Sequence, residues 1–485
     1  MATRDTFAYY QVVYDMLHGV APLLDERTIG YPLFLFFLEL IGSSPLKVIF
    51  IQCLISLAAS MYYVHLISKH LKTEKWAFMA GIIIFYASPQ SVCSDTYLMP
   101  TSLFTSFIIL TVAFLVKALY TDSPRAFSYF SLASAIVILI RPQGLFILPL
   151  LVLLFLYLLW NKKRKSMLYA IGVPITVILL ANCTYNYFTL GKFTLTDFAA
   201  MNNLGSSIYM LETDPGFPKE VNELIEETNK RIPVKNLFTI RNSTKYSELK
   251  NSFSFWDEAW PFKASLEKIY TGKNHWKVSD IMNRIGTNAK KKHPLLYLKF
   301  VCTNLVLYYD NFSQSYFFYY NELTSRNFYW GSGEYLLGYD YILNLTWKDM
   351  LPYPKGTTSF SVADEIKRDG FNAYFKNEPF LIRLNHYWEI VFNKIFVNVL
   401  WVFGYFAALV VYIINCIRLK RIDELSVFVI SLFLYVLLNS ALIMLIQYPF
   451  QRFSYPLTFI YYSFTFVAIQ QLANYFYSLY VKRNN

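Results

Sequence analysis

Charged residues, cysteine and histidine are all scarce in this chain of 485 residues. Only 16% of the residues are charged, whereas 55% are hydrophobic, which is the composition of an integral membrane protein. The five cysteines show no CxxC spacing and the histidines no metal-ligand spacing, so neither a disulfide framework nor a zinc site is indicated. Met1–Gly19 has neither a basic leader nor an apolar core, so no cleavable signal peptide is predicted.

The chain has instead a series of apolar segments of bilayer length. A membrane span needs about 20 apolar residues, and by this measure we predict about nine spans. They are roughly residues 46–71, 76–88, 101–119, 126–140, 144–160, 167–187, 388–417, 425–446 and 453–477. The net charge of +12 comes from basic residues in short loops, such as Asn161–Lys165 (NKKRK). Such loops lie on the cytoplasmic side, so we expect membrane topology rather than nucleic-acid binding, with the N-terminus outside.

Four regions follow from these spans. Residues 1–45 are predicted to form a first extracytoplasmic loop with interfacial helices, and residues 46–187 a transmembrane bundle of six spans. Residues 188–387 are too long and too polar for a loop between helices, so we expect an extracytoplasmic mixed α/β domain. Residues 388–485 form a C-terminal transmembrane part of three spans. The predicted fold class is an all-α polytopic membrane bundle with this outer domain.

Polar and ionisable side chains gather at the predicted outer mouth of the bundle, although they come from distant parts of the sequence. They are Asp5, Asp15, Asp25, Glu26, Arg27, Asp95, Tyr97, Arg141, Gln447, Arg452 and Tyr455. Ionisable groups at membrane depth are expensive and therefore indicate function. Arginines bind a phosphate well, and a carboxylate can take a proton from a hydroxyl nucleophile. The residues thus predict a polar cavity for an anionic lipid without identifying its chemistry.

Five motifs, in this order and topological placement, resemble those of a known superfamily. They are Asp5–Tyr10 (DTFAYY), Arg27–Pro32 (RTIGYP), Ile140–Gly144 (IRPQG), the strand-like Asn186–Phe193 (NYFTLGKF) and Gln451–Pro456 (QRFSYP). The chain resembles the GT-C superfamily of membrane glycosyltransferases, specifically the branch of protein mannosyltransferases and of the aminoarabinose transferase of lipid A (glycosyltransferase family 39-like). The resemblance covers most of both membrane halves and little of residues 212–385.

This resemblance implies that a sugar is transferred, with inversion, from a polyprenyl-phosphate carrier to a cell-envelope acceptor at the outer face of the membrane. It implies that Asp5 is the general base, with Asp95 as a possible second acid. The residues that it assigns to the lipid phosphate or the donor are Arg27, Arg141, Arg452 and Tyr455. The resemblance implies no certain cofactor, and it leaves open whether a divalent metal ion is bound.

Two departures from the family pattern lead to further expectations. Relatives have a span before the first-loop acid, whereas only Met1–Arg4 precede Asp5, so we expect that span to be missing from this chain. Relatives often have an acidic residue at the start of the span after the second outer loop, where this chain reads Met99–Ser102 (MPTS). Asp95 can take that place only if its loop folds toward the cavity.

The implied partners are a polyprenyl-phosphate-linked sugar, a glycan, lipid or protein acceptor, and the lipid bilayer. The implied location is a bacterial inner membrane with the active site on the extracytoplasmic face, in polysaccharide or glycolipid biosynthesis. Neither the sugar nor the acceptor can be read from the sequence. A lipid or polysaccharide transporter or flippase and a noncatalytic envelope-assembly protein remain alternatives.

Each candidate residue also has a structural interpretation. Asp5 suits a helix N-cap, Asp95 a loop cap, Arg141 a side chain that snorkels at the end of a span, and Arg452 an interfacial anchor.

Overall fold

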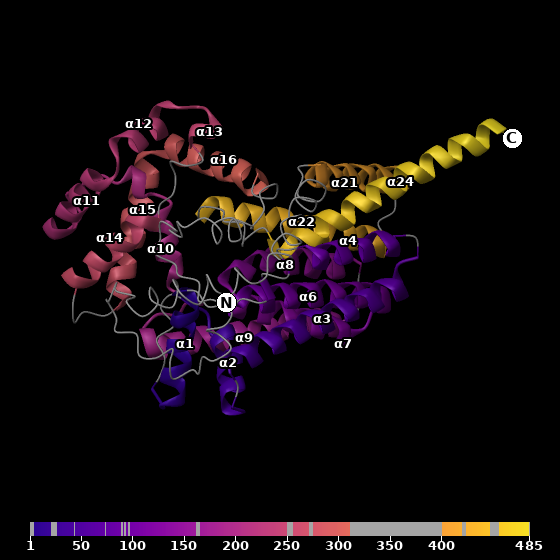
Figure 1. Ribbon diagram of the computed structural model, residues 1–485, viewed down its shortest axis with the longest axis horizontal. Helices are drawn as coiled ribbons and strands as arrows, with labels where there is room; N and C mark the ends of the chain where they lie inside the picture. The colour runs from indigo at the N-terminus through magenta and orange to yellow at the C-terminus, as the bar shows by residue number, and fades with distance from the viewer. Residues whose placement is uncertain are drawn as a thin grey trace, which may run out of the picture.

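All regular secondary structure among the residues that the structure describes is helical (Figure 1). The computed structural model describes residues 4–20, 27–42, 44–72, 74–88, 91, 94–95, 98–161, 165–249, 256–270, 275–310, 400–419, 423–446 and 455–484. Within these ranges no strand is present, which agrees with the predicted all-α polytopic membrane protein.

Long apolar helices form the main bundle around one hydrophobic core (Figure 1). In chain order they are α3 (Pro45–His70), α4 (Lys75–Ala87), α6 (Pro100–Thr121), α7 (Pro124–Ile140), α8 (Ile147–Trp160), α9 (Lys165–Leu190), α21 (Leu400–Leu419), α22 (Glu424–Ile446) and α24 (Thr458–Asn484). Two short 3-10 helices, η1 (Pro142–Phe146) and η4 (Tyr455–Leu457), precede α8 and α24. Helix α6 lies at the centre, because it packs against both α3 and α7 and is buried along most of its length.

Local sequence signals explain where the central helices begin and end. Proline occupies the first helical position of α3, α6 and α7, where its missing N–H leaves no bond unmade. Helix α6 ends at Asp122, which has a left-handed conformation (φ 47°) and whose N–H donates to the carbonyl of Ala118. Helix α7 then starts at Pro124, so α6 and α7 form a tight antiparallel pair.

Five described helical segments are long and apolar enough to cross a membrane. They are Leu46–His70, Pro100–Thr121, Pro142–Trp160, Lys165–Thr189 and Glu424–Leu445. The predicted spans at 76–88, 126–140 and 388–417 correspond to the shorter apolar helices Lys75–Ala87, Pro124–Ile140 and Trp401–Ile414, the last within a range that is only partly described. The length and composition of the described helices therefore do not confirm the predicted count of about nine spans.

Two short helices precede the bundle, as expected for the first loop. Helix α1 (Arg4–Leu17) packs against α2 (Gly30–Leu40), and α2 also contacts α7. The apolar α2 has 11 residues, too few to span a bilayer, which fits the interfacial helices predicted within residues 1–45.

A second group of helices, drawn at the left of Figure 1, replaces the predicted mixed α/β domain over its described residues. It comprises α10 (Phe198–Gly205), η2 (Ile208–Met210), α11 (Lys219–Arg231), α12 (Val234–Asn242), α13 (Tyr246–Leu249), α14 (Trp256–Ile269), α15 (His275–Lys292) and α16 (Pro294–Asp310). It has its own apolar core, and α11 shows why it is helical, since Val221, Leu224 and Ile225 recur at helical spacing and are buried. The expected strands are absent from residues 188–249, 256–270 and 275–310. Residues 311–387 lie outside the described part.

The prediction of a strand-like segment at Asn186–Phe193, where the chain leaves the bundle, is also wrong. Helix α9 continues to Leu190 and is followed by Gly191 with a positive φ of 72°. The buried Asn186 amide donates to the carbonyls of Thr194 (2.8 Å) and Leu195 (3.0 Å), which folds the chain back onto the helix. Aromatic residues suggested a strand here, but the helix and its side-chain hydrogen bonds decide the local structure.

Helix α16 connects the second group to the bundle. It packs along α22, where Tyr297 donates to the carbonyl of Leu445 (2.7 Å) and Asn304 to that of Met444 (3.3 Å). The polar side chains of α16 thus bond to the C-terminal end of α22.

Close packing of α4 against α24 depends on Gly81. A Cβ added at this residue would lie 2.6 Å from the backbone nitrogen of Ser463 on α24. We expect Gly81→Ala to destabilise the protein by about 1–3 kcal/mol through overpacking. The matched control is Gly172→Ala on α9, where nothing lies within 4 Å of the new Cβ. Thermal unfolding of the two detergent-solubilised variants tests this, and equal melting temperatures would contradict the packing.

Candidate active site

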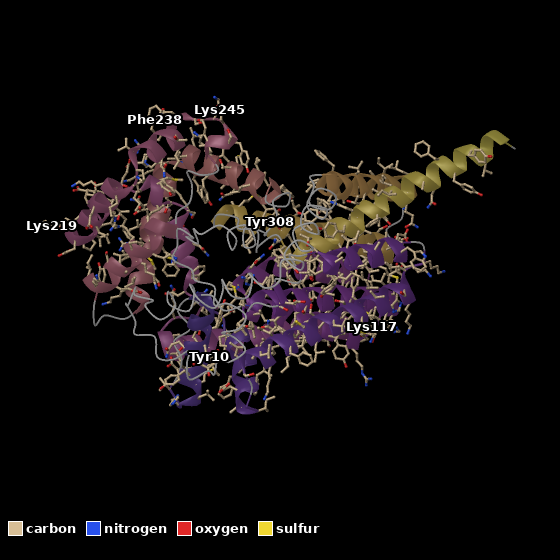
Figure 2. All side chains as sticks on the ribbon, viewed as in Figure 1. Tyr10, Lys117, Lys219, Phe238, Lys245 and Tyr308 are labelled. Atoms are coloured by element: carbon tan, nitrogen blue, oxygen red, sulfur yellow. The ribbon has the colours of Figure 1, made fainter. Side chains whose placement is uncertain are left out.

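The RTIGYP element connects α1 to the bundle through the side chains of Arg27 and Tyr31. The guanidinium carbon of Arg27 lies 4.9 Å from the ring centroid of Tyr9 on α1, within cation–π range. The Tyr9 ring in turn meets the Tyr31 ring edge-on, with centroids 5.1 Å apart. Arg27 is therefore held against α1, at the end of the bundle where Figure 2 labels Tyr10.

Gly30 brings the same element directly onto the end of α7. A Cβ at Gly30 would lie 2.5 Å from the carbonyl carbon and oxygen of Leu139 and 2.7 Å from the nitrogen of Ile140. Only a glycine permits this approach without displacing backbone. Arg141 directly follows Ile140. The RTIGYP and IRPQG motifs therefore lie next to each other in the fold.

A chain of hydrogen bonds continues from Tyr31 to the loop that carries Asp95. The Tyr31 hydroxyl donates to Gln52 Oε1 (2.9 Å), and Gln52 Nε2 reaches the carbonyl oxygen of Asp95 at the long distance of 3.5 Å. Tyr31 and Gln52 are both fully buried. Buried polar groups of this kind hold their partners in one geometry, since an unmade bond would be costly.

Asp95 lies against the first turn of α6. Its Oδ1 accepts a hydrogen bond from the Ser102 hydroxyl at 2.6 Å, and Ser56 on α3 also bonds to its side chain. Burial raises the pKa of Asp95 above the usual range of an aspartate, although both serines act in the opposite direction. The loop thus folds in the way needed for this carboxylate to reach the start of α6.

Arg141 is buried in the turn between α7 and η1. Its guanidinium carbon lies 5.7 Å from the ring centroid of Phe104, two residues beyond Ser102 on α6. Gln143, two residues after Arg141, donates to Asn439 on α22 (2.8 Å). Asn439 in turn donates to the Tyr308 hydroxyl on α16 (2.7 Å). The turn that carries Arg141 is therefore fixed to α2, α22 and α16.

Tyr455 is the one predicted side chain from the C-terminal part that the described residues include. It is buried, its ring stacks on that of Phe85 with centroids 5.1 Å apart, and it interacts electrostatically with Asp95. Asp5 lies in the first turn of α1, but its side chain is outside the described residues, as are Asp25, Glu26, Tyr97, Gln447 and Arg452. Asp15, on α1, accepts a hydrogen bond from Gln11 (2.9 Å).

The structure thus brings Arg27, Asp95, Arg141 and Tyr455 to one end of the bundle. The sequence did not predict the polar groups that position them, which are Tyr31, Gln52, Ser56, Ser102, Gln143 and Asn439. Their signal was polar residues inside apolar helices, which is expensive unless they are paired. No group of three or more His, Cys, Asp or Glu that could hold a metal ion occurs among the residues searched, which are those described.

Comparison with known proteins relates part of the chain to a described family. Residues 29–185 match the sequence model of the dolichyl-phosphate-mannose-protein mannosyltransferase family. This range contains Gly30, Asp95 and Arg141, and it ends near the end of α9. Neither the curated proteins nor the solved structures gave a match.

The raised pKa of Asp95 predicts a pH-dependent effect of Asp95→Asn on stability. The folded state favours the protonated carboxyl, so above the folded pKa it carries the cost of a buried charge. Asparagine has no charge at any pH. We therefore expect Asp95→Asn to raise the melting temperature at neutral pH, and the gain to shrink as the pH falls through the folded pKa of Asp95.

The control for this measurement is Asp122→Asn, at the exposed opposite end of α6, where asparagine also tolerates the left-handed conformation. It replaces an exposed carboxylate, so at neutral pH its effect on the melting temperature should be smaller than that of Asp95→Asn. A gain for Asp95→Asn that is the same in acid and at neutral pH would show that the carboxylate is not buried.

Proposed function

We propose that this chain transfers a sugar from a polyprenyl-phosphate carrier to an acceptor at the outer face of the membrane, because residues 29–185 match the model of a glycosyltransferase family of the GT-C type. The observation that carries the proposal is the position of Asp95, a half-buried carboxylate at the start of α6, at the end of the bundle that also holds Arg27 and Arg141. A carboxylate and guanidinium groups at one membrane depth suit a hydroxyl nucleophile and a phosphate leaving group.

The reaction needs one proton acceptor and a site for growing negative charge. The acceptor hydroxyl attacks the anomeric carbon of the sugar from the face opposite the phosphate, and its proton passes to a carboxylate. The bond between that carbon and the phosphate oxygen breaks, and its electron pair stays on the phosphate. Arg141 and Arg27, together with Arg452, stabilise this charge as it develops. A phosphate leaves as an anion, so it needs little help from an acid, and the configuration of the sugar is inverted.

Two carboxylates compete for the role of base. The family resemblance favours Asp5, whereas the geometry favours Asp95, whose raised pKa makes it a better proton acceptor than an ordinary aspartate once it is ionised. In either assignment Ser102 and Ser56 position Asp95, and Gly30 and Gln143 position Arg141.

The second helical group supplies a candidate surface for the acceptor. Its helix α16 is bonded through Tyr308 and Asn439 to the Arg141 turn, so it is fixed relative to the site. In Figure 1, α10–α16 lie beside the end of the bundle where α1 and α2 are found. We place the reaction on the extracytoplasmic side of a bacterial inner membrane, in the modification of a cell-envelope glycan, lipid or protein.

Sugar transfer by membranes that contain the chain tests the proposal directly. A panel of radiolabelled polyprenyl-phosphate sugars is offered as donor to the wild type and to Asp5→Asn, Asp95→Asn, Arg141→Ala and Arg452→Ala at matched expression. We expect loss of the catalytic base to lower the rate by roughly 10²–10⁴-fold. Arg141→Ala should lower the rate for the same donor, because a group that stabilises the leaving phosphate is removed.

The control for this panel is Lys72→Gln, an exposed basic residue between α3 and α4. It should retain full activity. If no donor is consumed by the wild type, the glycosyltransferase proposal fails and a transporter becomes the better explanation.

Ser102→Ala distinguishes the two candidate bases. The Ser102 hydrogen bond lowers the pKa of Asp95, so its removal raises that pKa further. If Asp95 is the base, the acid limb of the profile of kcat/KM against pH should move to higher pH. The conservative Ser102→Thr variant, which keeps a hydroxyl, should restore the wild-type profile. An unchanged acid limb in Ser102→Ala would exclude Asp95 as the base and leave Asp5.

A further inference from the structure

A groove lies between α7 and α9 at the end of the bundle opposite the candidate active site. It has a volume of about 470 Å³ and is lined at its mouth by Arg125, Ser128 and Ser166. Both helices begin here, at Pro124 and Lys165. Figure 2 labels Lys117, which belongs to the last turns of the preceding helix α6, at this same end. The groove is thus separate from the site around Asp95.

The deep wall of the groove is fixed by the packing of α9 against α7. Pro174, inside α9, has no N–H and so cannot close the usual helical hydrogen bond. Ser131 on α7 bonds to the next pair along the helix, since its hydroxyl donates to the carbonyl of Ile171 (2.7 Å) and accepts from the N–H of Ile175 (3.2 Å). The bonds hold the two helices in one relative position, and the groove opens beside them.

The lining combines a cation, hydroxyl groups and an aromatic and apolar surface. Arg125 and Ser166 are exposed and Ser128 is partly buried, so donors for a phosphate are available at the mouth. Tyr129 and Tyr169 are 47% and 67% exposed, as tyrosines at the boundary of a membrane often are. Val173, which is 50% exposed, continues the surface into the apolar region of α9.

We propose that this groove binds one anionic phospholipid from the leaflet at this end of the bundle. The phosphate of the lipid is held by Arg125 with the hydroxyls of Ser128 and Ser166, and one acyl chain lies along Tyr169, Val173 and Pro174. Charge favours this occupant, because Arg125 lines the groove and is exposed, and Lys165, which is also exposed, directly precedes the lining residue Ser166. Asp122, in the loop before α7, offsets part of that charge.

The apolar part of the groove favours a lipid over free phosphate as the occupant. A soluble anion would contact only the mouth, whereas the groove extends to Val173, two helical turns along α9 from Ser166. The proposal does not depend on the reaction at the other end of the bundle.

Retention of lipid by the purified full-length chain tests the proposal. The protein is incubated in detergent with equal amounts of phosphatidylglycerol and phosphatidylcholine that have identical acyl chains, and bound lipid is counted by native mass spectrometry. We expect phosphatidylglycerol to be retained preferentially. Arg125→Gln should lower this retention by roughly tenfold, as expected for a charge-assisted hydrogen bond to phosphate. Lys72→Gln, at the same end but outside the groove, should have no effect.

A second variant separates the groove from surface charge in general. Val173→Trp fills the apolar part and leaves Arg125 in place, on an exposed position where the fold tolerates it. It should also reduce retention, with unchanged thermal unfolding. Equal retention of the two lipids, or unchanged retention in Arg125→Gln, would overturn the proposal. Competition by glycerol phosphate alone would show a soluble-anion site and would equally overturn the assignment to a lipid.

Discussion

The close approach of Gly30 to the end of α7 is the constraint on which the candidate site depends. It allows the first-loop helices to rest on the backbone of Leu139 and Ile140, and it sets the position of Arg27 relative to Arg141. A larger residue at this position would separate α2 from α7, because the neighbouring atoms are backbone and cannot rotate away. The site is thus assembled by helix packing rather than by flexible loops alone.

Buried hydrogen bonds then fix the polar groups within an apolar bundle. Tyr31 and Gln52 connect the first loop to the Asp95 loop, and Gln143 and Asn439 connect the Arg141 turn to α22. Each pair comes from helices that are apolar over most of their length, where an unpaired amide would be expensive. A polar residue of this kind therefore specifies the register in which two helices pack, in addition to any part that it takes in chemistry.

The sequence was sufficient to predict the membrane class, most helices of the bundle and the grouping of Arg27, Asp95 and Arg141. Apolar runs and motif order carry that information locally. It did not predict that α10–α15 are helical, because amphipathic segments such as α11 alternate with aromatic and polar stretches that also suit strands. Nor did it predict the bond between Gln143 and Asn439, since nothing in either local segment specifies a partner 296 residues away. Pairings of this kind follow only from the packed fold.

That long sequence separation also has a consequence for biosynthesis. Gln143 leaves the ribosome well before Asn439, and at about 5–20 residues per second the interval is roughly 15–60 s. Throughout that time the turn after α7 is in the membrane without its partner on α22. The bond of the Arg141 turn to α22 therefore forms late in chain synthesis rather than early. Stalled or truncated chains would expose an amide inside the bilayer, which is a feature that membrane proteases and insertion chaperones can recognise.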